Sequence, residues 1–163
     1  MINNYDPAFD EVKKFFDDSI GTWTSHRNYY NHGNEGKIKP MTMKFNVEHV
    51  NDGDEGELYR VVVGKNNFSF RVKPFKGIIT DCVEIIRGNS VSNIDAFPTY
   101  AYPIRDPYAG DGIRMMTDSP RGKFVEDIRL IDNNVRTRKS LILSNSSLKP
   151  LMIGLYLEIK EKN

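Results

Sequence analysis

Two arginines in the second half of the sequence have the spacing of a binding site for anions. Arg136 and Arg138 are separated by one residue, so on a β-strand their side chains would point to the same face, about 7 Å apart. Two guanidinium groups at that spacing could bind two carboxylates or a phosphate in a bidentate manner. The alternative is that both arginines cover a solvated outer face, and the alternation of the strand leaves both interpretations open.

Two glutamates lie among residues that a strand would bury. Glu126 shares a strand face with Ile128 and Leu130, and Glu158 lies in the apolar run 155–159. A buried charge costs several kcal/mol unless it is paired. If these glutamates share an interior with the two arginines, they form an ion-paired polar patch of the kind that a charged ligand requires. A simple buried salt bridge is the alternative.

The turn between the two strands provides a geometric test of a shared interior. Asn133 and Asn134 form a turn signal between Glu126 and Arg136. A flush two-residue turn would place Glu126 and Arg136 on opposite faces of the sheet. All four charges can share one interior only if the hairpin contains a three-residue loop or a β-bulge.

Other chemically active residue types form no clear site. His26, His32 and His49 lack the spacing of metal ligands, so no metal site is expected. Cys82 is the single cysteine, which excludes an intrachain disulfide and a cysteine-based zinc site. We interpret Cys82 as a buried strand residue and not as a nucleophile.

The hydrophobic spacing predicts one amphipathic helix over residues 7–18. Pro7 suits the first helical position with Asp6 as the N-cap, and Gly21 is expected to end the helix. Apolar residues recur at intervals of three and four, which is typical of a helix with one buried face. The predicted apolar face consists of Phe9, Val12, Phe15, Phe16 and Ile20.

Short strand-like runs separated by turn residues follow the helix and predict an all-β antiparallel barrel or sandwich, most simply a closed meander. Residues 95–112 contain three prolines and a glycine-rich end, and they are predicted to form a long surface loop that is either functional or a variable insertion. The expected strands are 22–30, 38–50, 57–64, 67–73, 77–87, 113–117, 122–131, 135–144 and 151–160.

Length and composition predict one domain over residues 1–163. The net charge of +1, from 23 Lys and Arg against 22 Asp and Glu, argues against a general nucleic-acid binder. No run approaches the roughly 20 apolar residues that span a bilayer, and the first residues lack a secretory signal pattern. We therefore expect a soluble, cytoplasmic protein without a membrane or nucleic-acid partner.

Two segments resemble the motifs of the S-type phycobiliprotein lyases. Residues 15–30 read FFDDSIGTWTSHRNYY and are similar to the N-terminal pattern FFxxSxGxWxSxR. Residues 125–140 read VEDIRLIDNNVRTRKS and resemble a second motif, in which a Glu and an aromatic-rich strand precede PNLRxRxS. Glu158 matches an acidic position in the C-terminal strand. The chain departs from the second motif at residues 128–131, where a Trp-Phe pair is common in the family.

The resemblance implies a ten-stranded lipocalin-like (calycin-type) antiparallel meander barrel with a short N-terminal helix. It implies a chaperone-like bilin lyase that holds a phycobilin, either phycoerythrobilin or phycocyanobilin, without covalent attachment. The lyase would transfer the bilin to a cysteine of an apo-phycobiliprotein subunit, phycoerythrin or phycocyanin, of the cyanobacterial phycobilisome, forming a thioether. The bilin is then a substrate, no prosthetic group is expected, and a homodimer is allowed.

The resemblance also assigns roles to individual residues. Arg136 and Arg138 would hold the propionates of the bilin. Glu126 and Glu158 would be the catalytic carboxylates, near the pyrrole nitrogens, where they favour a protonated bilin. The nucleophile would belong to the client subunit and not to Cys82. The other expected bilin-binding residues are Trp23, Ser25 and Arg27.

Two other functions fit the same fold. A lipocalin-like carrier would bind a bilin or another amphipathic ligand and transfer nothing. An antiparallel-barrel interaction module would bind no ligand at all. Mixing the protein with free phycobilin separates these functions, because the lyase and a bilin carrier predict a spectral shift, whereas the interaction module predicts none.

Overall fold

A computed structural model describes residues 7–31, 38–74, 83–89, 99–108, 110–120 and 122–162. Within these ranges the chain forms one helix and ten β-strands. The elements are α1 (Pro7–Asp18), β1 (Gly21–Asn31), β2 (Ile38–Val50), β3 (Glu57–Val63), β4 (Asn66–Pro74), β5 (Val83–Asn89), β6 (Thr99–Ile104), β7 (Gly112–Ser119), β8 (Gly122–Asp132), β9 (Val135–Leu143) and β10 (Pro150–Lys160).

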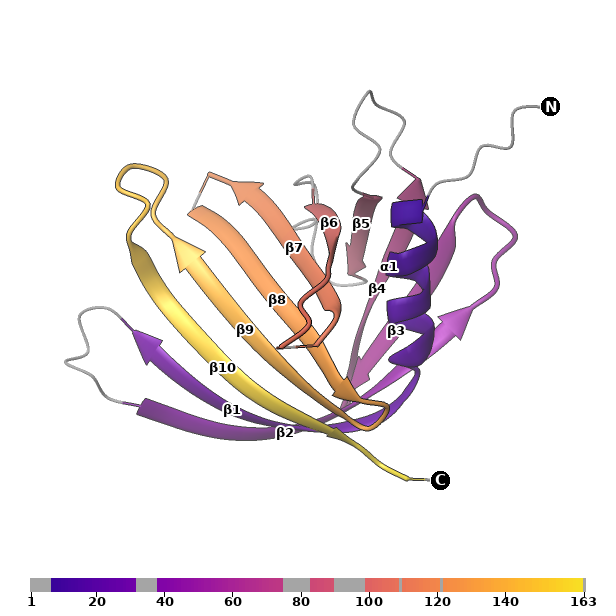
Figure 1. The fold of residues 1–163 in the computed structure, drawn as a ribbon, viewed down its shortest axis with the longest axis horizontal. Helices are drawn as coiled ribbons and strands as arrows, with labels where there is room; N and C mark the ends of the chain where they lie inside the picture. Colours follow the sequence, from indigo (N-terminus) through magenta and orange to yellow (C-terminus); the bar gives the residue numbers. More distant parts are fainter. Residues whose placement is uncertain are drawn as a thin grey trace.

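The strands form a closed antiparallel barrel (Figure 1). Each strand pairs with its neighbours in the sequence, and β1 closes the ring by pairing with both β2 and β10. Closure gives each described strand a neighbour on both sides, which limits edge-to-edge association, although β5 and β6 pair over only three residues. The predicted all-β meander barrel of the lipocalin type is therefore confirmed.

Helix α1 contributes its apolar face to the core. Phe15 and Phe16 are each 5% exposed and pack in one cluster with residues of the barrel interior, including Tyr59 and Ile113. The hydroxyl of Tyr59 donates a hydrogen bond to Asp17 Oδ1 at 2.7 Å, which fixes the end of the helix to β3. The helix lies against β4, β5, β6 and β7 (Figure 1).

The predicted end of the helix requires two corrections. The helix ends at Asp18, and Gly21 begins β1 with a φ of 135°. Ile20, predicted to lie on the apolar face, is 38% exposed because it follows the last helical turn. The predicted N-cap Asp6 lies outside the described residues.

The surface loop predicted over residues 95–112 is wrong in part, because it contains β6. Thr99 and Ala101 in this strand are fully buried, as an inward-facing strand residue should be. Proline has no N–H to donate to a neighbouring strand. In the described chain β6 pairs with β5 only over residues 99–101, so Pro103 lies beyond the hydrogen bonds on that side of the strand. The predicted strand 77–87 is described only from Val83 onwards, so Cys82 lies outside the described residues.

A β-bulge next to the β8–β9 turn aligns the charged residues. Asp132 pairs with Val135, but the next pair is Leu130 with Arg136, so Ile131 is an extra residue and is 56% exposed. The bulge brings the even-numbered residues of both strands to the same interior face. The predicted irregularity in this hairpin is therefore confirmed.

The outer face of β10 is apolar along its whole length. The odd-numbered residues face outward, and four of them are 42% to 44% exposed. We call this the outer stripe of β10: Leu151, Ile153, Leu155, Leu157 and Ile159. Exposed aliphatic residues in an unbroken row are unusual for a strand that faces water.

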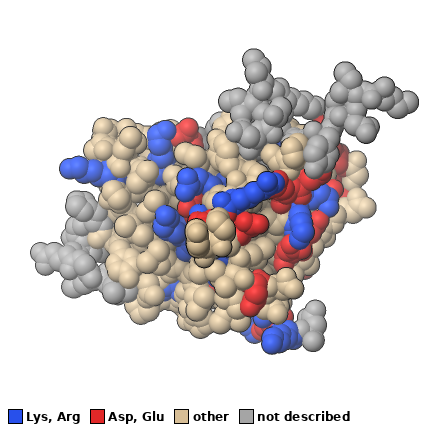
Figure 2. Space-filling model, viewed as in Figure 1, with Lys and Arg blue, Asp and Glu red and all other residues tan. Residues whose placement is uncertain are grey.

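Charged residues of both signs are mixed over the molecular surface. Figure 2 shows Lys and Arg beside Asp and Glu on the face that carries α1, where Lys13 pairs with Asp17 and Arg105 with Glu11. This mixture agrees with the small net charge. No helix in the described ranges has the length and hydrophobicity needed to cross a membrane.

Candidate ligand-binding site

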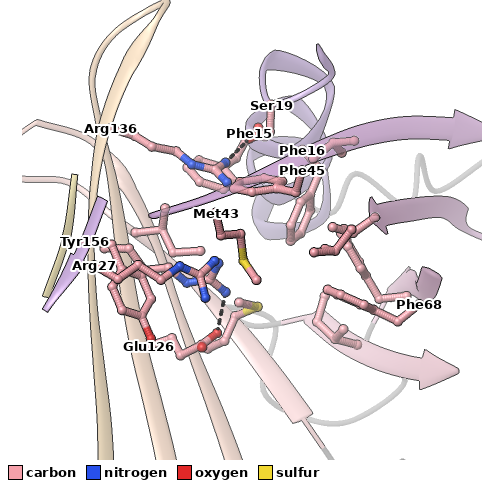
Figure 3. A pocket seen from close by; sticks show the side chains of 18 residues that line it. Phe15, Phe16, Ser19, Arg27, Met43, Phe45, Phe68, Glu126, Arg136 and Tyr156 are labelled. Atoms are coloured by element: carbon pink, nitrogen blue, oxygen red, sulfur yellow. Dashed lines mark hydrogen bonds and ion pairs between the residues drawn. The ribbon is translucent and has the colours of Figure 1, made fainter. Parts of the chain in front are cut away.

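The barrel encloses a cavity of about 300 Å³. Figure 3 shows Arg27, Tyr156 and Glu126 on one side of the cavity, opposite Phe68. The volume lies at the lower end of the range of roughly 300–1,000 Å³ that is usual for small-molecule sites. The apolar wall includes Met43, Phe45, Phe68, Phe70, Ile85 and Met115.

The polar wall consists of Glu126 of β8 and of two rows of side chains from the neighbouring strands β1, β10 and β9. Their registers form a first row of directly paired residues, in which Glu158 lies between Ser25 and Arg136. A second row lies two residues along each strand. In this row Tyr156 lies between Arg27 and Arg138.

Every charged group of the first row has a partner. Arg136 Nε lies 2.5 Å from Glu158 Oε2 and Ser25 Oγ donates to Glu158 Oε1 at 3.0 Å. Arg136 also donates to Ser19 Oγ at 2.9 Å. Arg136 is 4% exposed and Glu158 is not exposed at all. The sequence predicts this pairing as one of its two alternatives.

The ion pair keeps Glu158 charged despite its burial. Burial raises the pKa of this carboxyl group. The charges of Arg136 and Arg138 and the hydrogen bonds from Arg136 and Ser25 lower the pKa by more than burial raises it, so the pKa lies below its ordinary value. An unpaired carboxylate in the same position would be protonated instead. Glu158 therefore acts as the fixed counterion of Arg136.

Trp23 packs against Arg136 of the first row. Its indole Nε1 donates to the carbonyl oxygen of Ser19 at 2.8 Å, and the guanidinium carbon of Arg136 lies 4.3 Å from the centre of its ring. Trp23 is fully buried in a cluster with Phe45 and Val47. A cation over an indole face is a favourable contact, so Trp23 helps to fix the position of Arg136.

The second row is less completely paired. Arg138 donates to Glu126 Oε2 at 2.8 Å, and its Nε is the one buried side-chain polar atom in the described chain without a hydrogen-bond partner. Arg27 donates to Ser25 Oγ at 2.9 Å and to the hydroxyl of Tyr29 at 3.3 Å. No carboxylate among the described residues pairs with Arg27. The second row therefore retains capacity to bind an acceptor.

Tyr156 separates the two arginines of the second row. Its ring centre lies 4.6 Å from the guanidinium carbon of Arg27 and 5.9 Å from that of Arg138. Burial is the main cause that raises the pKa of Tyr156 to about 12, and a hydrogen bond with Tyr29 is the second. For Tyr29, burial raises the pKa, but the hydrogen bonds with Tyr156 and Arg27 and the charges of both arginines lower it more.

Sequence reasoning missed three polar residues of the site, although one of them carries a signal. Tyr156 is two residues before Glu158, so the alternation of the strand already places both on one face. Gly154 leaves room for the tyrosine ring, since a Cβ at this position would lie 2.7 Å from the hydroxyl of Tyr156. Ser19 is a fixed position of the N-terminal motif, but its role, like that of Tyr29, depends on the fold.

The structure brings all seven predicted site residues together, but only some of them reach the cavity. Trp23, Ser25 and Glu158 do not line it and instead contact Arg27 or Arg136. Their predicted roles in binding and catalysis stay predictions. The predicted residues that do line the cavity are Arg27, Glu126, Arg136 and Arg138.

The described residues contain no group of three or more His, Cys, Asp or Glu side chains that could hold a metal ion. Among the predicted candidates, His26 contacts Thr42 and His49 contacts Glu57 on the surface. His32, like Cys82, lies outside the described residues.

Comparison with solved structures identifies the fold. The S-type phycobiliprotein lyase CPES from Guillardia theta is similar to this chain with a TM-score of 0.68 and 15% sequence identity, over 93% of both chains. A protein of unknown function from the DUF3598 family of Nostoc punctiforme is similar with a TM-score of 0.50 and 13% identity, over 90% of this chain and 49% of that one. No protein-family model and no curated protein matches the chain. The resemblance predicted from the motifs is thus confirmed at the level of the fold.

Proposed function

We propose that this protein is a bilin lyase, which binds a phycobilin non-covalently and transfers it to a cysteine of a phycobiliprotein subunit. The observation that supports the proposal is the cavity: one wall is apolar, the other carries three arginines and a glutamate, and the barrel that holds it resembles a phycobiliprotein lyase. The proposal goes beyond the fold, because the likeness at 15% identity concerns the fold alone.

The chemistry of a phycobilin fits the two walls. A bilin is flat and largely apolar and carries two propionates, so it needs an apolar cavity with a few placed charges. Phe68 and Met115 on the apolar wall would contact the pyrrole rings. The arginines of the polar wall would receive propionate. Glu126, which lines the cavity, would accept hydrogen bonds from the pyrrole N–H groups and favour the protonated bilin.

The transfer step requires no nucleophile from this chain. The thiolate of the client cysteine adds to the ethylidene group on ring A, a C–S bond forms, and the bilin takes up the thiol proton. No oxidant or reductant is needed. This protein would contribute by holding the bilin in a reactive conformation. Glu126 is the proposed catalytic carboxylate at the cavity, and Glu158 supports catalysis by fixing Arg136.

The proposed partners follow from this reaction. They are a bilin, phycoerythrobilin or phycocyanobilin, and an apo-subunit of phycoerythrin or phycocyanin. A homodimer is compatible with the same proposal. The outer stripe of β10 is the exposed apolar surface that a protein partner would cover.

A two-stage assay tests the proposal. Purified protein is mixed with each free bilin and its absorbance spectrum is recorded, and an apo-subunit is then added and tested for a thioether-linked bilin after denaturation. We expect a spectral shift followed by transfer that is faster or more specific than spontaneous addition. A shift without transfer would favour a bilin carrier, and the absence of a shift would contradict both functions.

A further inference from the structure

The charges around the cavity do not cancel. Arg136 is paired with Glu158 and Arg138 with Glu126, whereas Arg27 has no carboxylate partner among the described residues. The polar wall therefore has one net positive charge, and it is carried by Arg27. The pKa of Tyr29 is raised by burial and lowered more by its hydrogen bonds with Tyr156 and Arg27 together with the smaller effects of the charges of Arg27 and Arg138.

The two rows differ in their capacity to bind an anion. Arg136 is 4% exposed and is held by Glu158, Ser19 and the Trp23 ring. A ligand carboxylate would have to compete with Glu158 for this charge, and displacing Glu158 would leave a buried carboxylate without a partner. Although Arg136 reaches the cavity wall, its charge is already balanced by Glu158.

The second row presents donors that lack acceptors. An arginine has five N–H donors, and the described contacts of Arg27 use two of them. Arg138 offers its buried, unpaired Nε, a defect that costs free energy unless a ligand supplies the acceptor. Both guanidinium groups line the same cavity and lie 4.6 Å and 5.9 Å from the ring centre of Tyr156, so of the donors in the cavity they come closest to a site for a carboxylate.

We propose that the cavity receives a single carboxylate of its ligand, bound by Arg27 and Arg138, and that Arg136 only positions the polar wall. The proposal deepens the proposed bilin-binding function and rests on it: one propionate is buried at the second row, and the other stays outside this row. It differs from the pairing of Arg136 with Arg138 as propionate ligands that the sequence motif predicts.

Esters of the ligand test the number of carboxylates that are bound. Phycocyanobilin, its two monomethyl esters and its dimethyl ester are titrated against the protein and followed by absorbance. We expect one monomethyl ester to bind within about 3-fold of the diacid and the dimethyl ester to bind roughly 30-fold or more weakly, as for loss of a buried charge-assisted contact. Equal losses for both monoesters, or no loss for the dimethyl ester, would overturn the proposal while leaving bilin binding intact. Absence of binding by every form would overturn the proposed function as well.

Substitutions assign the carboxylate to its arginine. Arg27→Gln should weaken the diacid by roughly 30-fold and leave the affinity of the dimethyl ester unchanged. The double variant Arg136→Met, Glu158→Leu removes the buried pair as a unit, which avoids an unpaired charge, and should keep the preference for the diacid over the dimethyl ester. Arg60→Gln, at a partly exposed arginine on β3 that does not line the cavity, is the matched control. Loss of the preference in the double variant but not in Arg27→Gln would overturn the assignment.

Discussion

At the scale of single residues, the surroundings of Arg136 and Arg138 matter more than their shared chemistry. Both come from β9 and point to the same interior, but the Nε of Arg136 is bound to Glu158 and the Nε of Arg138 is bound to nothing in the described chain. One arginine is therefore part of the framework of the cavity and the other is available to a ligand. Neither the spacing nor the residue type distinguishes them.

Replacing Glu158 by glutamine should destabilise the fold in a pH-dependent way. Near neutral pH the variant leaves Arg136 buried without its counterion, which should cost about 3–5 kcal/mol of unfolding free energy. Because the pKa of Glu158 is lowered by folding, its contribution is full above the ordinary value of 4.5 and is lost as the pH falls below it. Urea unfolding should therefore show the gap between variant and parent narrowing in acid.

The exposed glutamate Glu48, which lies 3.8 Å from Arg60, provides the control. Glu48→Gln should change the unfolding free energy by less than about 1 kcal/mol at any pH. A gap between Glu158→Gln and the parent that stays constant from neutral to acid pH would contradict the lowered pKa.

Replacing Gly154 by alanine should disturb the second row through Tyr156. The added Cβ would lie 2.7 Å from the hydroxyl and 2.8 Å from Cε1 of the ring, so the ring must leave its present position between Arg27 and Arg138. We expect a cost of about 1–3 kcal/mol in unfolding free energy, as for other overpacked sites, and weaker bilin binding. In a Tyr156→Ala background the same substitution should cost much less, and equal costs in both backgrounds would exclude the clash.

At the scale of elements, the bulge at Ile131 decides which charges meet. Without the bulge, the pairing that starts with Asp132 and Val135 would continue with Ile131 opposite Arg136. Glu126 would then face away from Arg136 and Arg138. One extra residue in one strand thus turns a surface carboxylate into a cavity carboxylate. Ile131 itself does not line the cavity.

Deleting Ile131 should abolish the site. A flush β8–β9 hairpin would move Glu126 to the opposite face relative to β9, which breaks its 2.8 Å contact with Arg138. We expect loss of bilin binding and a lower melting temperature in a thermal scan. Deleting Ser146, in the exposed turn before β10, is the matched control and should be tolerated. Retained binding in the Ile131 deletion would show that the register does not set the site.

Substituting the outer stripe of β10 should separate association from folding. Leu155 and Leu157 are each 44% exposed, and threonine suits a strand, so Leu155→Thr with Leu157→Thr should leave the melting temperature nearly unchanged. If a homodimer forms through the stripe, sedimentation should show a single chain for the variant and a dimer for the parent. Ile20→Thr, which changes an exposed aliphatic residue outside the stripe, should leave the association unchanged.

The sequence predicts most elements of this fold, for identifiable reasons. The helix over residues 7–18 matches in full because its apolar spacing and Pro7 are local signals. The strand β6 is missed because Pro103 lies within it and further prolines flank it, which is typical of loops, and its pairing with β7 and in part with β5 compensates for this. The need for a bulge follows from counting residues, whereas its position at Ile131 depends on long-range packing. The partners of Arg136 come from α1, β1 and β10, which no single segment reveals.

At the scale of the whole molecule, the cavity depends on pairing between distant parts of the chain. Ser25 and Glu158 are 133 residues apart and hydrogen bond across the closure of the barrel between β1 and β10. Contacts this far apart in sequence form slowly, because a long loop must close before they contribute. The ring and the polar wall are therefore completed together.

This closure has a consequence for protein synthesis. β10 follows every other described strand, so a nascent chain that has not yet extruded it carries both arginines of β9 but neither Glu158 nor Tyr156. At that stage Arg136 has no counterion and Arg27 has no ring to rest on. On the proposed function, the barrel could not hold a bilin until β10 leaves the ribosome, so chains truncated before β10 could not withdraw pigment from the cell.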